Sequence, residues 1–151
     1  MKFITKDNPK LWKHQKKALE FGYDKPAVGY FMDMGTGKSR VAIDEIINNC
    51  FKLTVILCPK SVVSVWPDEF KKWATVPVRV VPLDNNNIQK CCDLLVNLEL
   101  DKPTVVVVNY DRVVPRANKK GVKFSALGEM LLDAAKSKLI NAIYCDESHR
   151  S

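Results

Sequence analysis

The chain has 151 residues, which is enough for one domain with a hydrophobic core and too few for two ordinary domains. Apolar residues make up 46% and charged residues 27%, a composition typical of a globular protein that excludes a disordered or fibrous one. With 24 Lys and Arg against 17 Asp and Glu, the net charge of +7 favours an anionic partner such as nucleic acid or nucleotide, although a solvated basic surface fits the charge equally well.

Short β-branched runs alternate with longer segments of helical period along the chain. This alternation predicts an α/β fold in which a parallel sheet is sandwiched by helices. The predicted strands are Val28 to Met32, Thr54 to Cys58, Val78 to Val81, Thr104 to Asn109 and Ile140 to Asp146. The predicted helices are Ser39 to Phe51, Ser61 to Trp73, Asn87 to Leu98 and Ser125 to Lys138.

A basic stretch lies between the fourth predicted strand and the last predicted helix. It runs from Pro115 to Lys123 and carries Arg116, Lys119, Lys120 and Lys123 around Gly121. Glycine and flanking charge indicate an exposed loop or hairpin. The sequence leaves the role of this stretch open.

A glycine-rich segment, residues 32–39, follows the first predicted strand and opens the first predicted helix. This is the context of a phosphate-binding loop, where glycines let successive N–H groups point at a phosphate. The residues expected to bind nucleotide here are Gly35, Thr36, Gly37, Lys38 and Ser39. Lys38 would reach the β- and γ-phosphates, and the Ser39 hydroxyl would ligate Mg²⁺. The general pattern has glycine where this chain has Met32, so a glycine turn beside a solvated lysine is the alternative interpretation.

Two carboxylates end the last predicted strand. Asp146 and Glu147 follow an apolar run, so they emerge at the carboxyl edge of the sheet, where open α/β sheets bind their ligands. ATP hydrolysis needs a carboxylate for the metal and a group that activates water, and we assign Asp146 and Glu147 to these roles. With Lys38 they form the predicted catalytic set. The alternative is a carboxylate pair that only caps a loop, and His149 fits a surface histidine equally well.

Five segments carry a more specific signal: residues 11–15 (Leu-Trp-Lys-His-Gln), 33–39, 58–73 (with Cys-Pro-Lys-Ser, Val-Trp and Glu-Phe-Lys-Lys-Trp), 107–111 (Val-Val-Asn-Tyr-Asp) and 146–149 (Asp-Glu-Ser-His). In this order they resemble the Q motif, motif I, motif Ia with the helix after it, motif Ib and the DEAH box of one family. That family is the Swi/Snf-like ATPases of helicase superfamily two, motors that translocate along double-stranded DNA. Ser148 stands where the family usually has Ala.

The resemblance implies a RecA-like P-loop NTPase domain that uses ATP and Mg²⁺. It implies that Gln15 reads the adenine edge; a bond from this side chain to nearby backbone is the alternative, because a polar group on an apolar helix stripe needs a partner. It also implies that Lys60, Ser61, Asn109 and Tyr110 touch the DNA phosphate backbone. From the residues alone, Lys60 and Ser61 equally suit a strand end and a helix N-cap.

Residues 1–151 correspond to the first RecA-like lobe of such a motor, and the sequence stops two residues after the DEAH-like box. The family's motif III and second RecA-like lobe are therefore expected from elsewhere, in cis or in trans. An arginine from that lobe is worth about 10³ to 10⁵ in rate, so we expect this chain alone to hydrolyse ATP very slowly. A fragment of a longer motor and a natural short protein both remain open, with the fragment favoured.

Three hypotheses of function follow. The first is the ATP-binding lobe of a DNA-dependent ATPase or helicase-like translocase, which binds Mg-ATP and the DNA backbone. The second is a non-catalytic DNA-binding module, which binds duplex DNA with a steep salt dependence and ignores ATP. The third is an interaction protein that mimics or inhibits a full-length motor by binding a protein partner.

The cysteines and the apolar segments bear on the compartment. Cysteine occurs at Cys50, Cys58, Cys91, Cys92 and Cys145 without a C-x-x-C pair, which argues against a disulfide framework or a zinc site. Thiols that end apolar runs behave as small buried hydrophobes, which favours a reducing compartment. No apolar stretch approaches the roughly 18 residues of a membrane span. We therefore expect a cytoplasmic protein, or a nuclear one in a eukaryote, with no membrane partner.

Overall fold

The computed structural model describes residues 10–83, 93, 102–114, 116–118 and 121–146. Its α-helices are α1 (Lys13–Gly22), α2 (Lys38–Asn48), α3 (Trp66–Trp73) and α5 (Ala126–Lys136), and its short 3-10 helices are η1 (Lys60–Val62) and η2 (Tyr110–Arg112). The helix predicted at Asn87 to Leu98 lies outside the described residues except for Asp93. Glu147, Ser148 and His149 also lie outside them. No helix in the described part of the chain is long and apolar enough to cross a membrane.

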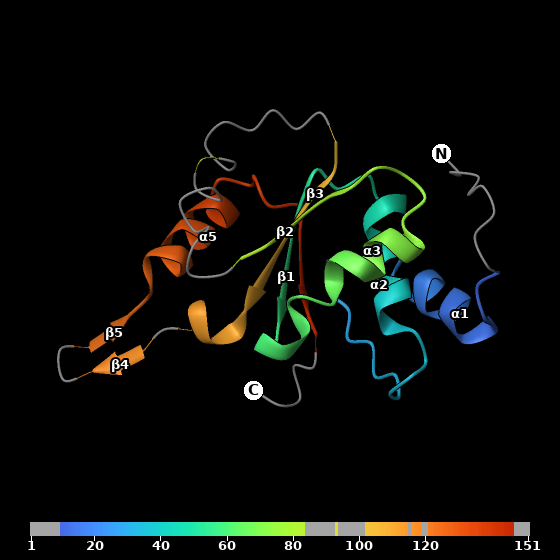
Figure 1. The fold of residues 1–151 in the computed structure, drawn as a ribbon, viewed down its shortest axis with the longest axis horizontal. Helices are drawn as coiled ribbons and strands as arrows, with labels where there is room; N and C mark the ends of the chain where they lie inside the picture. Colours follow the sequence, from blue (N-terminus) through green and yellow to red (C-terminus); the bar gives the residue numbers. More distant parts are fainter. Residues whose placement is uncertain (1–9, 84–92, 94–101, 115, 119–120, 147–151) are drawn as a thin grey trace.

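A parallel sheet forms the centre of the fold (Figure 1). Its strands are β1 (Leu53–Cys58), β2 (Arg79–Pro82), β3 (Thr104–Asn109) and β6 (Ala142–Cys145), in the order β2-β3-β1-β6. All three pairings are parallel, and the register sets Leu53 opposite Thr104. The predicted α/β fold with a parallel sheet is thereby confirmed.

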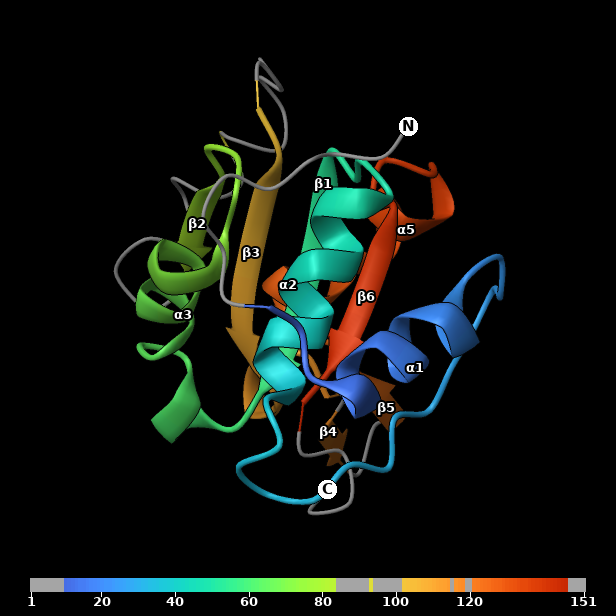
Figure 2. The same ribbon diagram turned by 90° about the vertical axis from the view of Figure 1, so that its right-hand side faces the viewer.

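Helices cover both faces of this sheet (Figure 2). Side chains of β1 and β3 alternate between the two faces: Ile56 and Val107 pack in the cluster under α2 and α3, whereas Val55 and Val108 pack in the cluster under α5. Every residue of β3 is buried, as a strand covered on both faces requires. The continuous valine run of the sequence therefore becomes the middle of the core.

The strand predicted at Val28 to Met32 is absent, and this prediction was wrong. A strand needs a neighbour to bond its backbone, and among the described residues β6 bonds only β1. Gly29 weakens the run as a strand, and the Phe31 side chain is fully exposed. The segment is instead held by side chains, since the Tyr30 hydroxyl donates to Glu45 Oε1 at 3.2 Å.

The helix predicted from Ser61 to Trp73 is divided into η1 and α3. Pro67 lies in the first turn of α3, where its missing N–H costs nothing. In a continuous α-helix, residue 67 would donate its N–H to the carbonyl of Val63. Proline has no N–H to donate, so the helix cannot run unbroken from Ser61 through Pro67. The first turn of the predicted helix therefore becomes the separate turn η1.

The basic stretch after β3 forms a hairpin, one of the two forms predicted for it. Strands β4 (Arg116–Asn118) and β5 (Gly121–Lys123) pair antiparallel as a sheet separate from the central one. Figure 1 shows this ribbon leaving the body of the molecule below α5.

Candidate nucleotide site and nucleic-acid edge

The predicted phosphate loop joins the extended segment before Met32 to α2. Gly35 has φ 77° and Gly37 has φ 82°, both in the left-handed region that favours glycine. Gly37 is also the N-cap residue of α2, so the loop ends at a helix N-terminus, where the first N–H groups have no acceptor within the helix itself. This backbone has the two features of an anion-binding turn, namely reversed glycine angles and a helix N-terminus.

The loop is closed by its own hydrogen bonds. The Thr36 hydroxyl donates to the Asp33 carbonyl at 2.6 Å, and the Lys38 ammonium donates to the Met32 carbonyl at 3.1 Å. The Lys38 side chain therefore folds back over the loop and contacts its first residue. Ser39, half-buried in the first turn of α2, follows it directly.

Helix α1 supports the loop through Gln15. This side chain is only 7% exposed; its Oε1 accepts from the Trp12 N–H at 3.0 Å, and its Nε2 donates to the Thr36 carbonyl at 3.1 Å. His14 Nε2 lies 2.9 Å from the same carbonyl. A Cβ on Gly37 would lie 2.4 Å from Gln15 Nε2, so the glycine also makes room for the glutamine. In this conformation Gln15 bonds backbone, which is the arrangement that we gave as the alternative to adenine binding.

A buried ion pair within α2, which sequence reasoning missed, also contacts α3 through its arginine. Arg40 Nε lies 2.8 Å from Asp44 Oδ2, with both side chains less than 10% exposed. The Arg40 guanidinium also lies 4.6 Å from the centre of the Trp73 ring, a cation–π contact. Burial raises the pKa of Asp44, and Arg40 opposes that shift. The only signal in the sequence is the i, i+4 spacing of opposite charges in a helix with many apolar residues.

The carboxyl ends of the central strands meet at one edge of the sheet, the end toward which the N-terminus of α2 also points (Figure 2). The register pairs Cys58 of β1 with Asn109 of β3. Lys60 and Ser61 follow β1 within η1, and both are exposed. Tyr110 follows β3 and begins η2. The four residues predicted to contact DNA therefore follow or end two neighbouring strands at the same edge.

Asn109 and Tyr110 use their polar atoms within the protein. Asn109 is buried, and its Oδ1 accepts from the Asp111 N–H at 3.3 Å. The Tyr110 hydroxyl donates to the main-chain carbonyl of Asp146 at 2.5 Å. One predicted nucleic-acid residue is thus bonded to the predicted metal ligand.

Asp146 lies immediately after β6 at this edge. Its N–H donates to the Leu57 carbonyl at 2.8 Å, which continues the pairing of β6 with β1 by one residue. Burial raises the pKa of the Cys58 thiol to about 11, and the negative charge of Asp146 adds to the shift. This carboxylate therefore lies close to the end of β1. The second predicted carboxylate, Glu147, lies outside the described residues.

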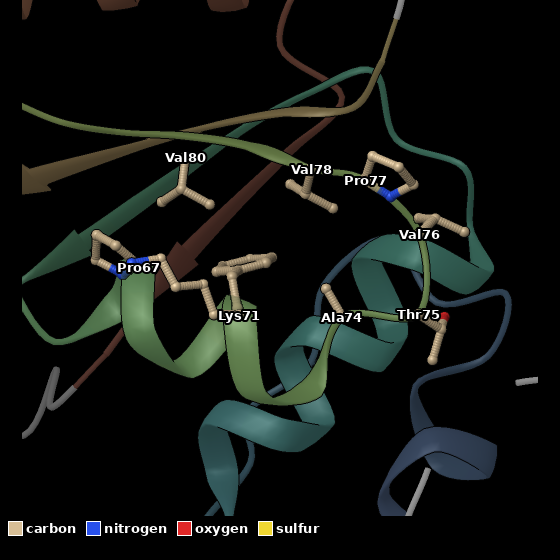
Figure 3. A pocket seen from close by; sticks show the side chains of 9 residues that line it. Pro67, Lys71, Ala74, Thr75, Val76, Pro77, Val78 and Val80 are labelled. Atoms are coloured by element: carbon tan, nitrogen blue, oxygen red, sulfur yellow. The ribbon is translucent and has the colours of Figure 1, made fainter. Parts of the chain in front are cut away.

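A separate groove of about 580 Å³ lies between α3 and β2 (Figure 3). Its lining combines the apolar residues Pro67, Phe70, Ala74, Val76, Pro77, Val78 and Val80 with the polar residues Lys71 and Thr75. None of the residues predicted to bind nucleotide, metal or nucleic acid contributes to it. The groove is therefore distinct from the predicted site.

The chain matches a known protein family. A family model described as "SNF2-related domain" matches residues 5–151. No curated protein matches the chain. The family match spans the phosphate loop, the carboxyl edge of the sheet and the basic ribbon.

Proposed function

The chain belongs to the family of SNF2-related domains, which makes it a domain of the ATPase or helicase type, and from this premise we propose that it binds Mg-ATP and the phosphate backbone of duplex DNA as the first lobe of a translocase. The observation that carries the proposal is the phosphate loop. Gly35 and Gly37 have positive φ at the N-terminus of α2, and Lys38 follows directly. Pattern, backbone and family membership support the same ligand.

The residues present fit a nucleoside triphosphate. Lys38 now donates to the Met32 carbonyl, a neutral acceptor. A phosphate oxygen is a stronger acceptor for an ammonium group, so bound ATP would take this bond over. Gly35, Thr36 and Gly37 would present backbone N–H groups, and Gln15, once released from Thr36, would face the adenine.

Ser39 and Asp146 are the residues that would hold Mg²⁺. Among the described residues, no three His, Cys, Asp or Glu side chains gather into a group that could hold a metal. Magnesium in nucleotide sites is bound through one or two protein groups plus phosphates and water, so this sparse set suits it. When bound, the ion neutralises charge on the phosphates. Lys38, Asp146 and Glu147 are the catalytic residues of this proposal.

The carboxyl edge is the proposed nucleic-acid surface. Lys60 and Ser61 are exposed there just after β1, and Tyr110 follows Asn109, which the register pairs with Cys58 at the end of β1. The charge-stabilising arginine of such motors comes from a second lobe. We therefore expect full ATP hydrolysis only when that lobe is supplied in cis or in trans.

The test is a titration of the purified chain with a fluorescent ATP analogue in Mg²⁺, beside Lys38→Ala. We expect saturable binding by the wild-type chain and at least a roughly tenfold weaker affinity in the variant, because a charge-assisted bond to phosphate is lost. Lys136→Ala, which removes an exposed lysine at the far end of α5, is the matched control and should bind like wild type. Circular dichroism checks that each variant is folded.

Two outcomes would contradict the proposal. One is the absence of saturable binding by the folded wild-type chain. The other is equal binding by wild type and Lys38→Ala. Either result would favour a nucleotide-independent module that binds DNA or a protein partner.

A further inference from the structure

The ribbon formed by β4 and β5 has no core of its own. Its register places Ala117 opposite Val122, and both are exposed, Val122 at 68%. An isolated two-stranded ribbon is marginally stable in water. The exposure of this central pair shows that the described part of the chain leaves it uncovered.

The charges of the ribbon do not stabilise it either. From Arg112 to Lys123 the sequence contains five Lys and Arg residues and no Asp or Glu. The register sets Arg116 directly opposite Lys123. Like charges directly opposite each other destabilise an antiparallel pair. An anion bound between them would remove that repulsion.

The base of the ribbon is fixed to the body of the molecule. The Ser125 hydroxyl, which caps α5 by accepting from the Gly128 N–H at 3.0 Å, donates to the carbonyl of Arg112. A Cβ on Gly128 would lie 3.1 Å from the carbonyl of Val113, the C-cap residue of η2, so α5 and the end of η2 are in close contact. The chain therefore enters and leaves the ribbon at one point, immediately after η2.

This base lies at the carboxyl edge of the sheet. η2 follows β3 there and contains Tyr110. From η2 the ribbon extends away from α5 and the sheet (Figure 1). The strands of the ribbon, with the exposed Lys123, thus continue from the proposed DNA surface beyond the body of the domain.

We propose that the β4–β5 ribbon is a second contact for the phosphate backbone of double-stranded DNA. The inference rests on the proposed function and adds a site to it. Proteins that hold single strands stack bases on aromatic side chains, and residues 112–123 include no aromatic residue. A two-stranded β-ribbon is also narrow enough to lie against a groove of a duplex, with cations directed at its phosphates.

The test compares wild type with the double variant Arg116→Ala/Lys123→Ala in binding to a labelled duplex of mixed sequence. Binding is measured by fluorescence anisotropy between 50 and 200 mM salt. Each phosphate contact adds about 0.9 to the slope of log affinity against log salt, so the variant should lose close to two units of slope. Its affinity at 0.1 M salt should fall roughly tenfold or more. Removing two opposed like charges should not unfold the ribbon.

The matched control is Lys52→Ala/Lys136→Ala. It removes the same net charge from exposed lysines, one just before β1 and one in the last turn of α5. These residues lie toward the amino edge of the sheet, away from the ribbon. The control should keep the wild-type salt slope, because only local phosphate contacts change that slope.

Several results would overturn the proposal. One is an unchanged salt slope in the ribbon variant, and another is an equal loss of slope in the control. The others are no duplex binding by wild type, and a loss of affinity in the ribbon variant that is larger for a single strand than for the duplex. Binding of the fluorescent ATP analogue is measured on the same samples. If wild type binds both the analogue and the duplex, a failed ribbon variant overturns only the ribbon inference. If wild type fails to bind either ligand, the proposed function itself is contradicted.

Discussion

Two glycines of the phosphate loop share a backbone conformation and differ in their surroundings. Both have positive φ, but a Cβ on Gly35 would meet nothing within 4 Å, whereas one on Gly37 would lie 2.4 Å from Gln15 Nε2. Position 35 therefore needs glycine only for its left-handed backbone conformation. The second also needs it for the packing of α1 against the loop.

The pair of variants Gly35→Ala and Gly37→Ala separates these two needs. An L-residue in the left-handed region costs about 1 to 2 kcal/mol, so Gly35→Ala should lose about that much free energy of unfolding. Gly37→Ala should lose more, because Gln15 must move and give up its bond to Thr36. Urea denaturation at neutral pH measures both. Equal losses would show that Gln15 moves aside freely.

Sequence reasoning found the loop and missed what supports it. Gly35, Gly37 and Lys38 form a local pattern, and reversed glycine angles follow from residue type alone. The bond between Gln15 and Thr36 joins residues 21 positions apart, so no local pattern announces it. The same holds for the contact of Arg40 with the Trp73 ring.

At the scale of elements, a tyrosine pair holds the segment before the loop. Tyr30 donates to Glu45 of α2, and Tyr144 of β6 lies close enough to the same carboxylate for Glu45 to raise its pKa. Burial and the nearby charge of Glu45 raise the pKa of Tyr30 to about 12, and the same causes raise the pKa of Tyr144. One carboxylate thus joins a helix, a strand and the segment that enters the loop.

These shifts predict a loss of stability at high pH. Because the folded-state pKa values lie above the unfolded value of 10.0, the tyrosine contribution is fully present below pH 10 and is lost as the pH rises through about 12 for Tyr30. Urea midpoints measured from pH 8 to pH 11 should therefore fall less steeply in Tyr30→Phe/Tyr144→Phe than in wild type. Tyr23→Phe, at a side chain 72% exposed, is the control and should follow wild type. Identical profiles for all three proteins would contradict the prediction.

The accuracy of the predicted elements depended on their environment. The runs that became β1 and β3 are buried on both faces, and their predicted limits agree with the structure to within one residue. The run at Val28 to Met32 looked similar, but a strand also needs a neighbour to bond, and a single run carries no information about that neighbour. Pro67 was visible in the sequence, and its effect on the preceding turn was underestimated.

At the scale of the whole molecule, Tyr110 connects the two proposed sites. It lies at the nucleic-acid edge, and its hydroxyl holds the main chain of Asp146. A shift of η2 on DNA binding would therefore move the proposed metal ligand. Coupling of this kind acts equally in both directions, so nucleotide should also strengthen DNA binding.

Tyr110→Phe should reduce this coupling while leaving each ligand bound. We expect a duplex at saturation to tighten binding of the ATP analogue by about fivefold or more in wild type, the lower end of usual coupling strengths. In the variant, the ratio of nucleotide affinity with duplex to that without duplex should approach one. Its affinity for nucleotide alone should stay within about threefold of wild type. Tyr23→Phe should couple as wild type does. Equal coupling in wild type and Tyr110→Phe, or none in wild type, would contradict the prediction.

The parallel sheet also sets the order in which a nascent chain can fold. β1 leaves the ribosome with no partner: β3 starts at Thr104, and the side chain of Asn141, which bonds the Leu53 N–H, follows 88 residues behind it. At about 5 to 20 residues per second, the roughly 50 residues before β3 take about 3 to 10 s to synthesise. During that interval β1 can be covered on one face only, by α2 and α3, because β3 and α5 have not yet been synthesised. Until β3 is synthesised, β1 therefore keeps an unpaired edge and an uncovered apolar face, the features that make a nascent chain prone to aggregation.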